Sequence, residues 1–234
     1  MILLALDTAL DACSVAVRAE GRVRARRRAE MRRGHAEALM PMVAAVMDEA
    51  GIGFASLDAL AATVGPGHFT GLRIGLAAAR GLALATRLPL IGVSTLETVA
   101  QNVPAAERTG RVLAVALETK RADLYVQTFD AHAEALAPPG ACLPEDAAAR
   151  LPGGAILLAG DGAPRLLAAL AAAGRGADAD RSTAAPVPDA TGVAAVAAAR
   201  IDREGLPAPS APPPAPLYLR PPDVTDPAAD KARR

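Results

Sequence analysis

A seven-residue segment, Gly65-Pro66-Gly67-His68-Phe69-Thr70-Gly71, constrains the fold of this chain more than any other feature. An apolar, strand-like run at 60–64 precedes it, and a run rich in Ala, Leu and Gly follows it at 71–87. Glycine adopts backbone angles that are closed to other residues, and proline fixes its own φ and lacks a backbone N–H. The segment therefore predicts a rigid elbow between a buried strand and a closely packed helix.

The elbow is also a candidate phosphate site, because N–H groups at a helix N-terminus attract anions. Its glycines are spaced G-x-G-x-x-x-G, which matches neither the dinucleotide fingerprint nor a P-loop. Pro66 also removes a donor that a phosphate would use. We therefore favour a structural role for the elbow and keep Gly65 and Gly67 only as weak candidates for cofactor binding.

The composition indicates a globular protein of one large or two small domains, with 234 residues of which 52% are hydrophobic. Aromatic residues make up only 2%, so Ala, Leu and Val must fill the core. Zero net charge gives no whole-chain argument for binding nucleic acid or membranes. Cys13 and Cys142 have no partner at metal-site spacing, so we expect reduced thiols in a cytoplasmic protein. The apolar residues 1–6 are too few for a signal sequence, and no run approaches a membrane span of ~20 residues.

The two halves of the chain follow one pattern. An apolar run at 2–6 ends at Asp7, and a second apolar run at 112–117 ends at Glu118. A hairpin is predicted after each acid, and each half later has a strand, a Gly-x-Gly turn and a helix. A duplicated α/β domain explains this repetition better than one large sheet.

Periodicity, capping and breaker signals place the remaining elements. Helices are predicted at 35–50, 71–87, 164–173 and 191–203, and after the capping box Ser94-Thr95-Leu96-Glu97. Strands are predicted at 2–6, 14–18, 22–28, 60–64, 90–93, 112–117, 124–129 and 156–159. We expect a first lobe of residues 1–103, a second lobe of residues 104–216, proline-rich at its end, and a partly disordered tail of residues 217–234.

Five motifs occur in one order over nearly the whole chain. They are Leu4-Ala5-Leu6-Asp7-Thr8 with Cys13-Ser14-Val15-Ala16, His35-Ala36-Glu37 with Pro41, the elbow continued by Leu72-Arg73, Gly92-Val93-Ser94-Thr95-Leu96-Glu97, and Tyr218-Leu219-Arg220. Together they resemble the bacterial TsaB family, also called YeaZ. The elbow is the specific motif, and the others are weak alone.

The resemblance implies an α/β, duplicated actin-like or sugar-kinase-like (ASKHA) fold, with two lobes that each contain a mixed sheet flanked by helices. It also implies a role in forming N6-threonylcarbamoyladenosine beside the anticodon of tRNAs that read codons beginning with A. Family members act there as non-catalytic partners of the paralogue TsaD, together with the ATPase TsaE, and pair with themselves when alone. ATP, Mg²⁺ and a metal are then expected in the partner proteins, with tRNA reached through the complex.

Three departures from the family pattern bear on chemistry. His68 stands where the elbow usually has Ser, Glu118-Thr119-Lys120-Arg121 replaces an Asp-Ala-Arg-Arg signature, and the tail is unusually rich in proline. The first two weaken a nucleotide site in this chain. We therefore expect no catalytic residue and no cofactor in it.

The alternative function is a small-molecule kinase or ATPase, in which an acid from each lobe holds Mg²⁺. Asp7 and Glu118 are the weak candidates for those acids. A metal site is not expected, because His35, His68 and His132 are all far apart in sequence. A peptidase is the third reading, with Ser14, His35 and Asp7 as the available triad types but no G-x-S-x-G motif.

Two surfaces are candidate binding regions. Seven arginines lie between positions 22 and 33, and we favour an edge strand protected by charge over a stripe that contacts tRNA phosphates. The helices at 35–50 and 71–87 are apolar on more than one side and are predicted to pair with the partner's helices. The predicted interface residues are Leu39, Val43, Met47, Leu72, Gly75 and Ala79.

Overall fold

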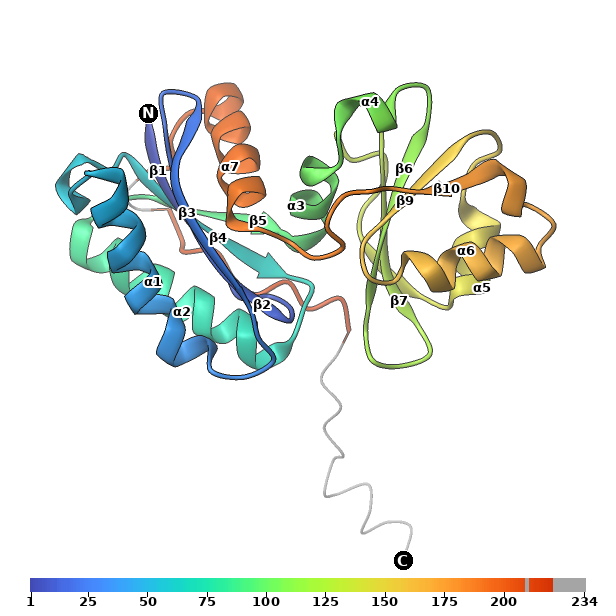
Figure 1. Ribbon diagram of the computed structural model, residues 1–234, viewed down its shortest axis with the longest axis horizontal. Coiled ribbons are helices and arrows are strands. Elements are labelled where there is room, and N and C mark those ends of the chain that lie inside the picture. Colours follow the sequence, from blue (N-terminus) through green and yellow to red (C-terminus); the bar gives the residue numbers. More distant parts are fainter. Residues whose placement is uncertain (209–210, 221–234) are drawn as a thin grey trace, which may run out of the picture.

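A computed structural model describes residues 1–208 and 211–220. Two lobes lie side by side, and each is built on a five-stranded mixed sheet (Figure 1). The first sheet has the order β3-β2-β1-β4-β5. Its strands are β1 (Ile2–Asp7), β2 (Ala12–Ala19), β3 (Arg22–Glu30), β4 (Ala59–Gly65) and β5 (Leu90–Ser94).

The second sheet repeats the topology of the first. Its strands are β6 (Val112–Glu118), β7 (Leu124–Phe129), β8 (Gly140–Cys142), β9 (Ile156–Ala159) and β10 (Ala179–Arg181). Its strand order is β10-β9-β6-β7-β8. Read from the β8 edge, this becomes β8-β7-β6-β9-β10, which matches β3-β2-β1-β4-β5 strand for strand, with β6 in the place of β1. In both sheets the first strand pairs antiparallel with the second and parallel with the fourth. The predicted duplicated, actin-like fold is confirmed.

The central strand β1 is buried on both faces, and the two faces carry side chains of different size. Leu4 and Leu6 point toward α1 (His35–Ala50) and α2 (Phe69–Thr86), which cover one face. Leu3 and Ala5 face α7 (Ala190–Glu204), with further alanines of β2 and β4 beside them. Alanines on both surfaces let α7 approach this face closely.

The position of α7 corrects the expected domain boundary. Residues 104–216 were predicted to form the second lobe, yet α7 packs on β1 and β2 of the first sheet. The physical reason is that the second apolar face of this central sheet must be covered, and α7 offers a matching stripe. This stripe comprises Ala190, Val193, Ala194, Ala197 and Ile201.

Four further helices complete the two lobes. They are α3 (Thr95–Asn102), α4 (Ala105–Arg108), α5 (Pro144–Arg150) and α6 (Ala163–Ala172), with 3-10 turns at Phe54–Ser56 and Gly176–Asp178. The predicted capping box of Ser94 and Glu97 is present at the start of α3. Leu96 and Val99 of α3 share a core with Leu113 and Phe129 of the second sheet. The lobes are therefore joined through an apolar layer, and α4, α5, β8 and β10 are elements that sequence analysis did not predict.

No helix in the described part of the chain is long and apolar enough to cross a membrane. The expected disordered tail falls largely on residues 221–234, which lie outside the described residues.

Candidate functional site

The elbow packs against the turn between β1 and β2. The N–H of His68 donates to the carbonyl of Ala9 at 2.8 Å, and the Thr8 hydroxyl donates to the carbonyl of Gly71 at 2.7 Å. A Cβ at Gly67 would stand 2.5 Å from the Ala9 carbonyl oxygen, and one at Gly71 would stand still closer to that of Thr8. The glycines are thus required for close packing of backbone on backbone, as the structural interpretation predicts.

Asp7, one of the two candidate magnesium acids, lies inside the protein with no exposed surface. Its Oδ1 accepts hydrogen bonds from the Thr63 hydroxyl at 2.8 Å and the Ala9 N–H at 3.1 Å. Its Oδ2 has no hydrogen-bond partner among the described residues. Burial raises the pKa of this carboxyl to about 6. Asp7 therefore fixes the end of β1 and is not presented to a ligand in the cleft.

Glu118, the second candidate acid, is held by Arg165 of α6. Arg165 Nη1 donates to Glu118 Oε2 at 2.7 Å. The same guanidinium donates to the backbone carbonyls of Arg121 and Ala122 at the tip of the β6–β7 hairpin. Glu118 thus belongs to an ion pair that supports the hairpin, and neither acid is free to bind a metal ion in this arrangement.

The residues of the peptidase reading are not assembled into a triad. The Ser14 hydroxyl accepts from the N–H of Ala190 at 2.9 Å, and the His35 Nε2 lies 3.1 Å from the carbonyl of Leu10. No hydrogen bond joins Ser14 to His35 within the described residues. A Ser side chain that is almost fully buried beneath α7 is also closed to a peptide substrate.

Histidine and carboxylate groups do not gather into a ligand set in the described ranges. No group of three or more His, Cys, Asp or Glu side chains there is placed to hold a metal ion. His68 instead lies with its Nδ1 3.4 Å from Asp11, and burial lowers the pKa of its imidazole.

The six predicted interface residues are corrected by their burial. Leu39, Val43, Met47 and Ala79 belong to the core beneath α1 and α2, and Leu72 to the core between the lobes. A Cβ on the sixth residue, Gly75, would collide with Thr8. The wide apolar surface of each helix misled the prediction, because its inner half packs on the sheet.

The outer surface of the two helices is nevertheless apolar. Met40 is 44% exposed and Leu84 is 82% exposed. Ala44 on α1, and Ala77 and Gly81 on α2, are exposed as well. These five residues form what we call the outer helix face, which nothing in the described part of the chain covers.

The predicted arginine-rich edge strand is confirmed, since β3 lies at the edge of the first sheet. Several of its arginines are neutralised by nearby acids, such as Arg27 by Glu49 at 3.3 Å and Arg24 by Glu20 at 2.8 Å. Most of the positive charge is therefore locally balanced, in keeping with a solvated, protected edge.

Residues 211–220 form a C-terminal strap that lies on the elbow and bridges the two lobes. The Leu217 N–H donates to the carbonyl of Val64 at 2.7 Å, and the Tyr218 ring stacks on Phe69 with centroids 5.9 Å apart. Arg220 Nε then reaches Asp123 Oδ2 of the second lobe at 2.7 Å. These contacts give the late Tyr218-Leu219-Arg220 motif a structural role that sequence analysis missed.

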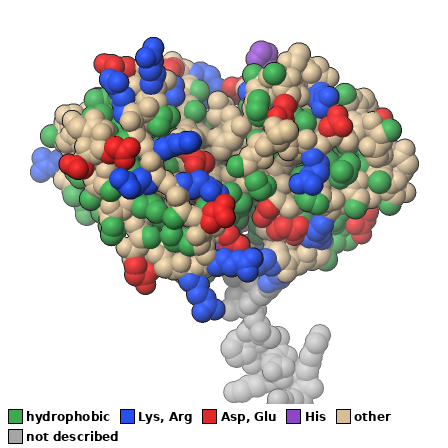
Figure 2. All heavy atoms as spheres, in the orientation of Figure 1, with side chains coloured by type: hydrophobic (Ala, Val, Ile, Leu, Met, Phe, Trp, Pro, Cys, Tyr) green, Lys and Arg blue, Asp and Glu red, His purple; other side chains and the backbone are tan. Residues whose placement is uncertain are grey.

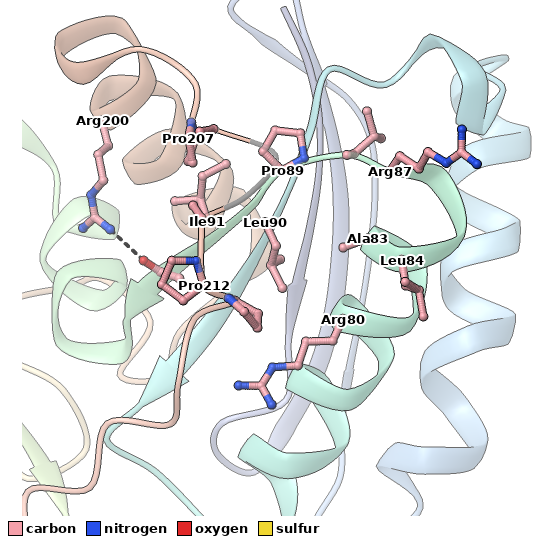
Figure 3. Close-up of a pocket in the computed structure, with 15 residues that line it drawn as sticks. Arg80, Ala83, Leu84, Arg87, Pro89, Leu90, Ile91, Arg200, Pro207 and Pro212 are labelled. Atoms are coloured by element: carbon pink, nitrogen blue, oxygen red, sulfur yellow. Dashed lines mark hydrogen bonds between the residues drawn. The ribbon is translucent and has the colours of Figure 1, made fainter.

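Two cavities flank this region. One, of about 700 Å³, lies between the C-terminal half of α2, β5 and the proline-rich segment. Figure 3 shows Pro89, Leu90 and Ile91 in its apolar wall. The Arg200 guanidinium, also in the lining, donates a hydrogen bond to the Gly92 carbonyl. The other, of about 650 Å³, opens at the cleft between the elbow, the β3–α1 loop and the β6–β7 hairpin.

Comparison with known proteins identifies the family of this chain. The model of "TsaD: tRNA N6-adenosine threonylcarbamoyltransferase" matches residues 28–160, more than half of the chain. The tRNA threonylcarbamoyladenosine biosynthesis protein TsaB of Escherichia coli is 43% identical over 125 residues, 53% of each chain. A tRNA N6-adenosine threonylcarbamoyltransferase of Erythrobacter litoralis is 52% identical over 65 residues, which are 28% of this chain and 19% of that protein. The match thus spans about half the length of the TsaB relative.

A solved structure extends the likeness over the whole fold. YeaZ from Pseudomonas aeruginosa superposes with a TM-score of 0.75 and 29% identity, over 93% of this chain and 99% of that one. With the duplicated sheets and the elbow, these matches show that the chain belongs to the threonylcarbamoyltransferase (TsaD) family, in its TsaB, or YeaZ, group.

Proposed function

We propose that this chain takes part in forming N6-threonylcarbamoyladenosine in tRNA, as a non-catalytic partner of a TsaD-type threonylcarbamoyltransferase in the cytoplasm. The functions for which its relatives are named support the pathway. The modified base would lie next to the anticodon of tRNAs that read codons beginning with A. The ATPase TsaE joins the assembly, and the chain reaches tRNA through the complex.

The outer helix face is the observation that carries the partner role. Two adjacent helices of a solvent-facing layer leave Met40 and Leu84 exposed, with small residues, Ala44, Ala77 and Gly81, around them. Small side chains permit close approach of another helix, and apolar side chains left exposed on two neighbouring helices favour an interaction site. We infer that the helices of the paralogue pack here, and that a second copy of this chain occupies the same face when the paralogue is absent.

The state of the two acids argues against catalysis by the chain alone. Asp7 is buried, and Glu118 is bound to Arg165. ATP, Mg²⁺ and a catalytic metal therefore belong to the partner proteins in this proposal.

Reconstitution of tRNA modification with purified TsaD-type and TsaE-type proteins tests the role. We expect threonylcarbamoyladenosine to form with this chain present and to be strongly reduced without it. Leu84→Glu should abolish TsaD binding and product formation with an unchanged circular dichroism spectrum. Leu136→Glu is the matched control, because Leu136 is 56% exposed on the second lobe and should bind normally. Equal loss in both variants, or in neither, would contradict the assigned interface.

A small-molecule kinase or ATPase remains the competing class, since it shares this fold. The discriminating measurement is ATP turnover by the isolated chain with Mg²⁺. Steady hydrolysis that is lost in Asp7→Asn would favour the kinase, whereas turnover only in the presence of the partners favours the subunit role.

A further inference from the structure

We propose that the apolar cavity beside β5 binds a small aliphatic carboxylate, which is an apolar chain with one anionic head group. The cavity has a volume of about 700 Å³, within the range of small-ligand sites. The C-terminal half of α2 and the strand β5 form one wall, and residues 207, 208 and 211–213 of the proline-rich segment form the other. Its described lining residues are all different from those of the cavity at the cleft.

The two walls offer aliphatic surface. The first wall carries the side chains of Ala83, Leu84, Leu88, Leu90 and Ile91. Figure 3 shows Leu90 and Ile91 facing the same space as Pro207 and Pro212. Among the described lining residues there is no Phe, Tyr or Trp on which an aromatic ring would stack. Walls of this kind favour a flexible aliphatic chain, which gains contact with every methylene that it buries.

The charged residues of the lining are all arginines. Arg80, Arg87 and Arg200 belong to it, and its described residues include no Asp or Glu. On the face of the molecule that Figure 2 shows, acidic and basic side chains are instead interspersed across both lobes. A ligand in the cavity would therefore meet positive charge with no acid in the walls, which favours an anionic head group.

Arg80 is the arginine best placed to bind that head group. Arg200 is already neutralised, because its Nη2 lies 3.0 Å from Oε1 of Glu97. Arg80 has no acidic partner among the described residues, and its Nη2 donates to the carbonyl of Pro214 at 2.5 Å. This hydrogen bond holds the guanidinium at the cavity and leaves further N–H groups for a carboxylate, which matches a guanidinium in shape and charge. The Arg87 side chain points away from the apolar wall in Figure 3.

The free edge of β5 adds a backbone donor. β5 is the last strand of the first sheet, and the N–H of Leu60 in β4 donates to the carbonyl of Pro89. Since alternate residues of a strand direct their backbone groups to opposite sides, those of Leu90 and Gly92 point away from β4. The Gly92 carbonyl accepts from Arg200 of the cavity lining, but the Leu90 N–H has no acceptor within the described ranges. A bound carboxylate would supply one.

Titration calorimetry of the isolated chain tests the site, so the outcome does not depend on the proposed partner role. The ligands are decanoate, octanoate and decyltrimethylammonium, each below the concentration at which it forms micelles. We expect decanoate to bind, and octanoate to bind about 15-fold more weakly, since each of its two missing methylenes costs about a factor of four. Decyltrimethylammonium has the same chain with the opposite charge and should bind at least about tenfold more weakly than decanoate.

Two variants test the anchor. Arg80→Gln should weaken decanoate binding by about tenfold, because a charge-assisted hydrogen bond is lost. Arg87→Gln is the matched control, since it is the same change at another exposed position near the end of α2, and it should bind within about twofold of wild type. Methyl NMR locates the ligand independently. The Ile91 methyl signals should shift on addition of decanoate, whereas those of Ile156, in the core of the second lobe, should not.

The site is refuted if decanoate does not bind at millimolar concentration, or if it binds without moving the Ile91 signals. Binding of decyltrimethylammonium as tight as that of decanoate would refute the anionic head group. Equal losses in Arg80→Gln and Arg87→Gln would refute Arg80 as the anchor. Should Arg80→Gln fail to fold, the three ligands and the Ile91 signals of the wild-type protein decide the outcome.

Discussion

Replacing Asp7 by Asn should remove a specific part of the pH dependence of stability. The carboxyl is fully buried, and this burial raises its pKa from 3.8 to about 6 in the folded protein. Hydrogen bonds from Thr63 and Ala9 lower the pKa but do not offset burial. An acid with a raised folded-state pKa binds its proton more tightly when folded. Its contribution is therefore most favourable below pH 3.8 and is lost as pH rises through about 6.

The magnitude follows from the shift. A difference of about 2 pKa units is equivalent to about 3 kcal/mol, the cost of ionising Asp7 in the folded state at neutral pH. About 2.4 kcal/mol of this cost should appear between pH 4 and pH 7.5. The remainder is already present at pH 4, because Asp7 of the unfolded chain is partly ionised there. Asn keeps an oxygen for the Thr63 and Ala9 donors. Its new N–H₂ takes the place of the unpartnered Oδ2 at a cost of about 1–3 kcal/mol.

The assay is urea unfolding of wild type and Asp7→Asn at half-unit steps from pH 4 to pH 7.5. The difference in free energy of unfolding should shift by about 2.4 kcal/mol in favour of the variant as pH rises. Asp202→Asn, an exposed change on α7, should track wild type. The reasoning fails if Asp7→Asn and wild type change in parallel, since Asp7 would then be ionised at no cost. A shift of opposite sign would show that a cation stabilises the carboxylate.

Three further outcomes are expected. Gly71→Ala should destabilise the protein by several kcal/mol, because its Cβ would collide with the Thr8 carbonyl oxygen. Gly81→Ala, with open space around it, should stabilise the protein by about 0.5–1 kcal/mol. Thermal unfolding compares the two variants, and equal effects would contradict the packing argument. Val43→Glu should lower stability by about 3 kcal/mol or more, because a carboxylate would be buried in the core under α1; near-wild-type stability would place Val43 at a surface. Changing Arg26, Arg27 and Arg28 together to Ser should leave the affinity of the complex for tRNA unchanged and promote some aggregation. A loss of tRNA affinity that depends on salt would instead favour a stripe that contacts tRNA phosphates.

Local signals in the sequence placed most of the elements of both lobes. The capping box of Ser94 depends on interactions within a few residues, and the elbow and the apolar runs before Asp7 and Glu118 are each recorded in a short stretch of sequence. Such interactions repeat in the second half, so the duplication was also visible. Short elements such as β8 and β10 were missed, because three residues carry too little periodicity to distinguish them from loops.

The tertiary structure decided which face of each element meets the protein and which meets solvent. Sequence alone determined that α1 and α2 are apolar on more than one side. It could not distinguish Val43, which is buried against the sheet, from Leu84, which is exposed to solvent. Likewise, only the fold brings Arg165 to Glu118, and Arg80 to the proline-rich segment. Helix and strand formation follows from short-range chemistry that the sequence records directly. Burial and charge pairing depend on contacts between residues far apart in the chain, which exist only once the chain has folded.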